Sequence, residues 1–298
     1  MNSFPGQFVS AYAIHLAIMI AIYLLLAQSL NVTLGLGRLF NLAHVSSYAL
    51  GAYTTALLAT KAGASFGACI LAAMVVSGLF SFLLGAIALR LSSDYFAVGT
   101  LAFSAIVAAV LVNWRSVTNG VLGIPGIPRP EFGGIDFDAN GNFLILAATC
   151  ALVMNVGLLI LAKGRFGRIL RGAAEYEHAA LALGHNVRRT RGWAFFIAST
   201  IAGLAGALFA YYLNYIDPSS FSLTEMVFIL TIVVVGRPGS FSGVALGTAC
   251  LILLPEALRF IEISSAYLGP ARQLLYAAIL FGVVAARRNH LFSPTREV

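Results

Sequence analysis

The sequence predicts an all-α protein built as a polytopic bundle of transmembrane helices. Of its 298 residues, 60% are hydrophobic and only 10% are charged, whereas a soluble domain carries about 25% charged residues. The apolar residues gather in runs close to the roughly 20 residues that a helix needs to cross a bilayer. The length then allows about eight to ten crossings and no sizeable soluble domain, so residues 1–298 are expected to form a single transmembrane domain.

Nine apolar runs predict nine crossings. They lie at about 11–30, 43–60, 66–89, 96–113, 142–162, 193–213, 223–236, 243–258 and 271–286. The first run follows no Lys or Arg and is too long for the apolar part of a signal peptide, so it predicts a retained helix. The run at 223–236 is short enough to re-enter the membrane without crossing it, which keeps counts of eight to ten open.

The positive charges fit an odd number of crossings. With nine crossings, 13 of the 18 Lys and Arg residues fall on one side: Arg38, Arg90, Lys163, Arg165, Arg168, Arg171, Arg188, Arg189, Arg191, Arg237, Arg287, Arg288 and Arg296. Cytoplasmic loops carry the excess of such residues. We therefore expect an outside N-terminus and a cytoplasmic C-terminus, and we read the net charge of +7 as a topology signal rather than a sign of nucleic-acid binding.

Two linkers are long enough to hold structure. The external linker 114–141 is rich in Gly and Pro, which indicates turns on a solvated surface, and it could form a lid or a docking ledge. The internal linker 163–192 is polar and holds an alanine-rich stretch before Gly184. It predicts a short cytoplasmic helix that ends at a C-cap glycine.

The motifs of enzymes and metal sites are missing from the sequence. Lys61 and Lys163 are the only lysines and neither follows a glycine, so the chain has no phosphate-binding loop and we expect no ATP hydrolysis by it alone. Cys69, Cys150 and Cys250 show no metal-ligand spacing and are interpreted as small core residues. We therefore expect no catalytic residue, metal or cofactor in this chain.

A run interrupted by glycines and polar residues, from Asn31 to Thr55, is the first candidate site. Irregular backbone at membrane depth is tolerated where protein or a water-filled cavity satisfies its polar groups, and transporters use broken helices at their binding sites. The candidate pathway residues are Asn41, His44, Ser46, Ser47, Tyr48 and Gly51. The alternative is a cytoplasmic turn followed by a helix with ordinary Ser/Thr packing, with His44 as a satisfied interfacial histidine.

A second glycine-rich turn separates two apolar runs. Its candidate residues are Gly236, Arg237, Gly239, Ser240 and Gly243, and a purely structural hairpin explains them equally well. The small residues Ala198, Ala202, Gly206 and Ala210 recur every four positions, which indicates helix packing.

Ionisable residues near or inside the apolar runs favour a different class of function. They are His15, Glu225, Glu256, Arg259 and Glu262, and such groups in membranes are functional candidates. We place them near the outer ends of helices, where a carboxylate costs little. The resulting alternative is an ion-coupled secondary carrier that uses Glu225 or Glu256.

Several segments resemble one family in the same order. They are Asn41–His44 with Gly51–Tyr53, Asp94–Leu101, Asn113–Ser116 with Thr118–Gly120, Gly167–Arg171 with Glu175, Glu177 and Ala182–Val187, and Gly236–Gly243. Together, over about 23–286, they resemble the permeases of branched-chain amino acid ABC importers, in the LivM-like subfamily.

The resemblance implies an importer assembled from several subunits in the bacterial cytoplasmic membrane. This permease would join a second related permease, two ATPase subunits that bind ATP and Mg, and an external substrate-binding protein. Alternating access would carry branched-chain or other small neutral amino acids inward, or alternatively urea or short-chain amides. A zwitterion's carboxylate would meet backbone N–H groups and hydroxyls such as Ser46, Ser47 or Tyr48.

By the same resemblance, the linker helix within 167–184 would dock on the ATPase. The coupling residues are then Arg168, Arg171, Glu175, Glu177, Leu183 and Gly184. Ala174 and Tyr176 stand where the family usually has charged residues, so the contact would depend more on the glutamates and arginines. The alternative for this linker is a solvated loop whose arginines fix topology or touch anionic lipid.

Overall fold

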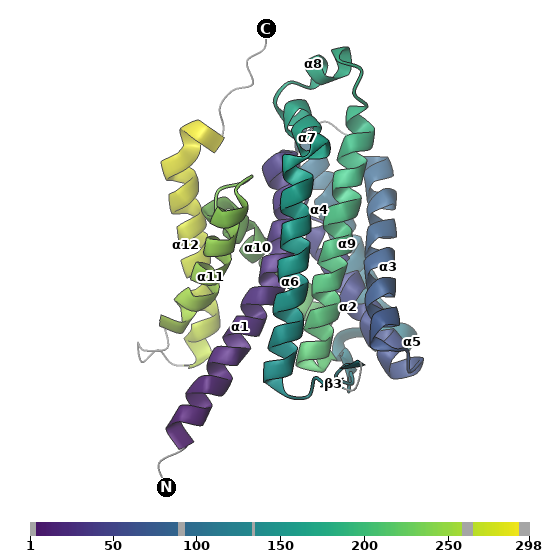
Figure 1. Cartoon of the computed structure of the whole chain (residues 1–298), viewed down its shortest axis with the longest axis vertical. Coiled ribbons are helices and arrows are strands. Elements are labelled where there is room, and N and C mark those ends of the chain that lie inside the picture. Colours follow the sequence, from purple (N-terminus) through teal and green to yellow (C-terminus); the bar gives the residue numbers. More distant parts are fainter. Residues whose placement is uncertain (1–3, 89–92, 133–134, 258–264, 292–298) are drawn as a thin grey trace.

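A computed structural model describes residues 4–88, 93–132, 135–257 and 265–291, and it is a bundle of α-helices (Figure 1). Each of the nine predicted apolar runs coincides with one helix. The helices are α1 (Phe4–Asn31), α2 (His44–Lys61), α3 (Phe66–Ala88), α4 (Ser93–Asn113), α6 (Asn140–Lys163), α9 (Val187–Leu213), α10 (Leu223–Val235), α11 (Phe241–Ala257) and α12 (Ser265–Leu291). The fold class predicted from the sequence is confirmed.

Short elements occupy the two ends of the bundle. At one end α7 (Arg165–Glu175) and α8 (Glu177–Ala182) connect α6 to α9, and at the other end lie α5 and the strands (Figure 1). The remaining short elements are η1 (Val32–Leu36, a π-helical turn), α5 (Arg115–Thr118), η2 (Gly120–Leu122), β1 (Ile124–Pro125), β2 (Glu131–Phe132), β3 (Ile135–Asp136), β4 (Tyr215–Ile216) and η3 (Pro218–Phe221). We call these two ends the α7–α8 end and the α5 end.

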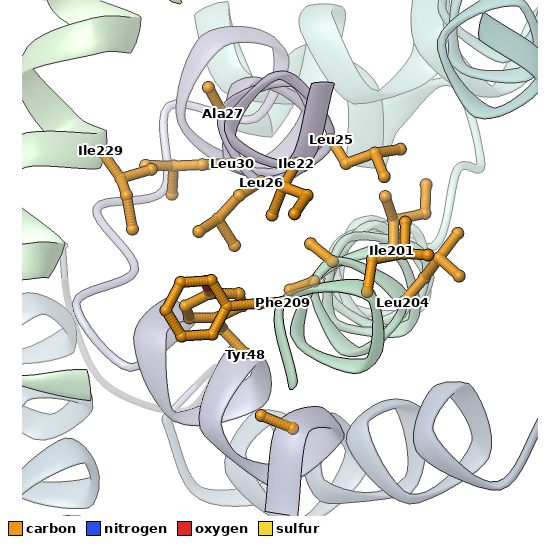
Figure 2. Packing of buried hydrophobic residues seen from close by; sticks show 14 of the residues in the cluster. Ile22, Leu25, Leu26, Ala27, Leu30, Tyr48, Ile201, Leu204, Phe209 and Ile229 are labelled. Carbon is orange, nitrogen blue, oxygen red and sulfur yellow. The ribbon is translucent and has the colours of Figure 1, made fainter. Parts of the chain in front are cut away.

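Helices α1, α2 and α9 form the centre of the bundle. Helix α1 contacts α6, α9, α10 and α11, and α9 contacts α2 and α3 along their lengths. Figure 2 shows the contact: Leu26 and Leu30 of α1 face Tyr48 of α2 and Phe209 of α9. Glycines let the backbones approach closely, since a Cβ on Gly51 would lie 2.2 Å from the carbonyl oxygen of Gly203. The small-residue row Ala198, Ala202, Gly206 and Ala210 is fully buried here, which confirms its packing role.

The outer helices α3, α4 and α6 present apolar side chains outward. Leu79, Val98 and Leu152 are each more than half exposed. An apolar surface of this extent suits lipid rather than water. Of the described helices, five are long and apolar enough to cross a membrane, α1, α3, α4, α6 and α9, and α10 and α11 are shorter apolar helices. The structure therefore supports a multi-pass membrane protein, and nine crossings stays a prediction.

Two expectations about single residues need correction. Cys250 is exposed on α11, so only Cys69 is a buried core thiol, with Cys150 half-buried. The linker helix is split into α7 and α8 at Tyr176, whose φ of −141° is not helical. The predicted glycine cap is present after α8: Gly184 has φ +80°, and the amide of His185 donates to the carbonyl of Ala180 at 3.1 Å, as in a Schellman motif.

The external linker is tied to the bundle at several points. Arg129 donates to the carbonyl oxygen of Asp138 at 2.7 Å and to Asn140 Oδ1 at 2.8 Å, and its guanidinium stacks over Tyr212 at 5.7 Å. Strand β1 pairs with β4 beyond α9. This anchoring favours the ledge over the lid as the interpretation of this linker.

Candidate functional site

The predicted interruption after Asn31 is a turn at the α7–α8 end. Helix α1 widens into η1, and the amide of Leu39 donates to the carbonyl of Thr33 at 3.0 Å, which is longer-range than any α-helical bond. Arg38 then adopts φ +50°, a left-handed conformation that is uncommon outside glycine. The chain reverses there, and α2 begins at His44.

The second glycine-rich turn packs directly against the first. The side-chain carbonyl of Asn31 accepts a hydrogen bond from the amide of Gly239 at 2.7 Å. Gln28 donates to the carbonyl of Phe241 at 2.7 Å. A Cβ on Gly35 would lie 2.2 Å from the Gly239 nitrogen, so only glycine allows this approach. The two turns, 208 residues apart in sequence, form one unit.

Helix α7, from the internal linker, packs against the first of these turns. Leu170 of α7 is buried and lies against Gly37, since a Cβ on that glycine would be 3.4 Å from Leu170 Cδ1. Arg171 donates to the carbonyl of Ala162 at 2.9 Å, and Arg168 donates to that of Lys163 at 3.0 Å. These bonds fix the angle between α6 and α7. Helix α7 is therefore held on η1 by packing and on α6 by its arginines.

A polar cavity of about 330 Å³ opens where these three segments meet. We call it the junction cavity. Its lining residues are Gly35, Leu36, Arg38, Arg171, Ala174, Glu175, Arg237, Pro238, Gly239 and Ser240. Three arginines against one carboxylate make it a place for an anionic group, such as an acidic side chain of a docked protein. Arg237 also takes a left-handed φ of +70°.

The structure thus brings together the coupling residues and the second glycine-rich turn, whereas the pathway candidates around α2 lie elsewhere. Arg171 and Glu175 meet Arg237, Gly239 and Ser240 at the junction cavity. Gly236 and Gly243 pack on each other behind the turn, where a Cβ on Gly243 would lie 1.9 Å from the Gly236 carbonyl oxygen. The remaining coupling residues, Glu177, Leu183 and Gly184, lie on or just after α8, where both oxygens of Glu177 accept from Arg191, at 3.2 and 2.9 Å.

The pathway candidates on α2, and Asn41 just before it, lie inside the packed core. Ser47 donates to Ser199 at 3.0 Å, and Ser77 donates to the Ser47 carbonyl at 2.8 Å. Ser46 and Gly51 are buried, and Asn41 accepts the amide of Ala43 at 3.1 Å. This arrangement favours the alternative of a turn followed by a helix with Ser/Thr packing.

Several buried polar groups lack a partner in the described part of the chain, namely His44 Nδ1, the hydroxyls of Tyr48, Tyr53 and Thr55, and Asn155 Oδ1. His44 is fully buried rather than interfacial; its Nε2 lies 2.9 Å from Ser29 Oγ, and its Nδ1 is unsatisfied. The Tyr48 hydroxyl is also unsatisfied, although its ring packs against Phe221 at 5.1 Å. Buried polar groups normally find partners, so a ligand or water that reached this core would find unused hydrogen-bonding capacity at these atoms.

The acidic residue Glu225 is bonded to a residue of α1. It is in the first turn of α10, and its carboxylate accepts a hydrogen bond from the hydroxyl of Tyr23. Tyr23 is near the middle of the candidate span Ala11–Leu36, so Glu225 lies at the end of its own helix, as expected, but packs beside the middle of α1. Of the other ionisable residues, His15 pairs with Tyr212 at 2.6 Å, whereas the side chain of Glu256 and the whole of Arg259 and Glu262 lie outside the described residues.

Some of these partners could not be selected from the sequence. Tyr23, Gln28, Asn31 and Arg38 all contribute to the contacts above. The available signal was polarity: Gln28 and Asn31 are amides at the end of an apolar run, and such groups require partners. Nothing in the sequence says that Gly239 and Phe241 supply them.

Comparison with known proteins agrees with the resemblance seen in the sequence. The family model of the branched-chain amino acid transport system permease component matches residues 12–284. The permease protein LivM of the high-affinity branched-chain amino acid transport system of Salmonella typhimurium is 35% identical over 285 residues, which covers 88% of this chain and 67% of that protein.

Two permeases of one archaeon also match. The probable branched-chain amino acid transport permease LivM of Methanocaldococcus jannaschii is 28% identical over 80% of this chain and 70% of its own length. The probable LivH of the same organism is 26% identical over 59% of this chain and 56% of its own length. No solved structure matches the chain significantly. The predicted resemblance is confirmed, with LivM proteins aligning over more of the chain than LivH.

Proposed function

The chain belongs to the branched-chain amino acid transport system permease family, and on that premise we propose that it is the permease subunit of an ATP-binding-cassette importer that moves branched-chain amino acids inward. In this proposal the chain spans the cytoplasmic membrane with its N-terminus outside and its C-terminus in the cytoplasm. It works with a second related permease, two ATPase subunits and an external substrate-binding protein.

The observation that carries the proposal is the junction cavity. Helix α7 touches η1, and the cavity connects it to the turn between α10 and α11. A force applied to α7 and α8 from outside the bundle therefore reaches the ends of α1, α2, α10 and α11. Such a lever suits a permease whose ATP hydrolysis takes place in a separate subunit, which would bind the ATP and Mg.

The charges support the orientation. Among the described residues, the α7–α8 end carries the arginines of α7 and α9 with Arg38 and Arg237, whereas the opposite side carries Lys61, Arg115 and Arg129. By the positive-inside rule the α7–α8 end is cytoplasmic. The α5 end then faces outward, and its anchored linker, with exposed Val121 and Leu122, is the ledge for the binding protein.

The substrate contact is proposed at the Tyr48 hydroxyl. Of the three hydroxyls named from the sequence, Ser47 already donates to Ser199, whereas the Tyr48 hydroxyl has no partner in the described residues. It lies beside Phe209 and Phe221, apolar neighbours that suit an aliphatic side chain. Ser46 and Ser47 would then shape the site by holding α2 against its neighbours.

Reconstitution into vesicles tests the proposal. The chain is purified alone and with its co-expressed permease, ATPase and binding-protein partners, and uptake of radiolabelled leucine is measured with and without ATP. We expect uptake only with all partners and ATP. Uptake by the chain alone under a proton or sodium gradient would establish the ion-coupled carrier, for which Glu225 and its partner Tyr23 are the candidate coupling residues. ATP-driven uptake of urea or acetamide but not leucine would establish the alternative substrate class.

A further inference from the structure

A second cavity lies at the α7–α8 end and shares no lining residue with the junction cavity. It has a volume of about 470 Å³ and lies between the end of α3 and the start of α9. We call it the arginine groove. Its lining residues are Ser81, Phe82, Gly85, Asn186, Arg188, Arg189, Gly192 and Trp193. None of these residues belongs to the predicted pathway or coupling set.

Arg188 and Arg189 are the linker arginines that line the groove, and they differ from three of their neighbours in the linker by being unpaired. Arg165 on α7 is exposed as well, but it does not line the groove. Arg168 and Arg171 bind carbonyl oxygens, and Arg191 is paired with Glu177 at 2.9 Å. The guanidinium groups of Arg188 and Arg189 have no hydrogen bond or ion pair to any described residue. They are exposed at the mouth of the groove, where they can bind an anion from outside the chain.

The wall of the groove is aromatic. Trp193 lies edge-on to Phe82 at 6.2 Å and to Phe196 at 5.6 Å, and Phe82 lies 5.0 Å from Phe196. Trp193 and Phe82 remain 43% and 47% exposed. A tryptophan with apolar neighbours on one side and charged groups on the other is typical of the membrane–water interface. The cluster places the bilayer surface at the level of the arginines.

An apolar track continues from the groove along the outside of α3. Val75, Leu79 and Phe82 follow one another at helical spacing and are all exposed. Side chains three and four positions apart lie on one face of a helix. A molecule bound in the groove would therefore have cations at one end and a continuous apolar surface extending toward the α5 end.

We infer that the arginine groove binds an anionic phospholipid, with its phosphate on Arg188 and Arg189 and its acyl chains along Trp193, Phe82 and the outer face of α3. A soluble phosphate has no apolar part that could pack on the aromatic wall. A zwitterionic lipid has no net negative charge, so two unpaired arginines would attract it only weakly. This inference requires that the chain be embedded in a bilayer, and it is independent of what the chain transports.

Fluorescence quenching tests the inference on the full chain. The sequence holds two tryptophans, so Trp114→Phe leaves Trp193 as the single reporter. The protein is placed in phosphatidylcholine nanodiscs that contain a small fraction of brominated phosphatidylglycerol or, in parallel, brominated phosphatidylcholine. Each interfacial arginine enriches anionic lipid by about fivefold. We therefore expect stronger quenching by the brominated phosphatidylglycerol, and equal quenching by the two lipids would overturn the inference.

Substitutions test whether the preference for phosphatidylglycerol arises in the arginine groove. R188Q/R189Q should abolish the preference and R188K/R189K should retain most of it, whereas R165Q, at an exposed arginine on α7, should leave it unchanged. Gly192→Leu adds a side chain where a Cβ meets no atom within 4 Å, so it should fill the groove and lower the preference with all charges intact. Gly172→Leu, at an equally open helical glycine, is its matched control. An unchanged preference in the R188Q/R189Q or the Gly192→Leu protein contradicts the assignment.

A last arm separates lipid from soluble anion. Inorganic phosphate at millimolar concentration is added to the same nanodiscs. The quenching by phosphatidylglycerol should fall no more than in a potassium chloride control of equal ionic strength. A specific loss with phosphate would show that the groove holds a soluble anion and would overturn the assignment to a lipid.

Discussion

The crossing of α2 and α9 and the junction cavity are built from the same kinds of residue, yet they differ in what those residues do. At the crossing, Gly51 and Gly206 bring two backbones together and Ser47 is bonded to Ser199. At the junction, Gly35 and Gly239 bring two turns together beside a cavity with three arginines. Glycine and serine thus mark a packed core in one place and the lining of a polar cavity between two turns in the other.

The largest expected effect comes from closing the approach at the crossing. In Gly51→Val the new Cβ would lie 2.2 Å from the Gly203 carbonyl oxygen, so α2 and α9 must separate. Overpacking of this kind costs about 3 kcal/mol, and we expect little folded protein by size-exclusion chromatography. Gly172→Val, at a helical glycine with open space around it, should fold normally. Equal yields of the two variants would contradict the close packing of α2 on α9.

A substitution at the junction should cost less stability than overpacking at the crossing, because at Asn31 it removes only one hydrogen bond between the two turns. Asn31→Leu leaves the amide of Gly239 without its acceptor, and an unsatisfied polar group of this kind costs about 1–3 kcal/mol. The free energy of unfolding in mixed detergent measures the loss. Asn113→Leu removes an amide that binds only its own helix at an exposed position, and its cost should stay below about 0.5 kcal/mol. Similar losses in both variants would show that the two turns are not joined in this way.

A charge reversal at Glu175 tests whether the junction cavity takes part in coupling ATP hydrolysis to transport. It replaces the single acid among the residues that line the junction cavity with a fourth cation. In the assembled complex with Glu175→Lys, we expect ATP hydrolysis and substrate capture to persist while uptake falls about tenfold. A factor of this size corresponds to a typical coupling free energy between two sites.

Glu177 provides the matched test on α8. Glu177→Lys should also reduce coupling, and the exchange E177R/R191E should restore it, because the pair between α8 and α9 is then rebuilt. Normal coupling in both charge-reversed proteins would count against docking through α7 and α8.

Tyr48 and Ser47 distinguish transport from packing within the core. Tyr48→Phe removes a hydroxyl that has no partner in the described residues, so stability should be unchanged, whereas the leucine concentration for half-maximal uptake should rise about fivefold, the value of one neutral hydrogen bond. Ser47→Ala should instead cost about 1 kcal/mol of stability. If Tyr48→Phe leaves the uptake curve unchanged, the substrate contact lies elsewhere.

The smallest effect is expected at the α5 end, at Asp217. Burial alone would raise the pKa of this carboxyl, but hydrogen bonds from Ser219 and Ser220 lower it below its ordinary 3.8. A lowered pKa stabilises the fold above the ordinary value, and this contribution is lost as the pH falls through the folded-state pKa. The unfolding temperatures of the wild type and Asp217→Asn should therefore differ at pH 6 and converge only as the pH falls well below 3.8. A gap independent of pH would show that the Asp217 charge is not the cause.

Much of the fold could be predicted from the sequence because helix positions in membranes follow from local composition. Apolar runs near 20 residues leave few alternatives for the backbone, and the run at 193–213 differs from α9 only by the extra turns from Val187 onward. The break at Tyr176 was missed because no glycine or proline marks it. On the far side of the break, Glu177 of α8 pairs with Arg191 of α9, a contact that local sequence does not encode.

The candidate site was only partly predictable, for the same reason. The residues Arg171, Glu175, Arg237 and Gly239 were named from two separate segments, and the cavity that unites them depends on Asn31 binding Gly239 across 208 residues. Conversely, Ser47 has the polarity of a pathway residue, but the partners that satisfy it come from α3 and α9. Polarity alone does not tell a lined pathway from a satisfied core.

The central claim is that the α7–α8 end lies in the cytoplasm and receives the motion of a separate ATPase, and cysteine labelling tests it most directly. Single cysteines replace Leu183, which is 76% exposed after α8, and Leu122, which is 81% exposed at the α5 end, in a chain whose three native cysteines are serine. A membrane-impermeant maleimide should label Leu183→Cys only in inside-out vesicles, with protection by bound ATPase subunits, and Leu122→Cys only in intact spheroplasts. Labelling of Leu183→Cys from outside the cell would contradict the account.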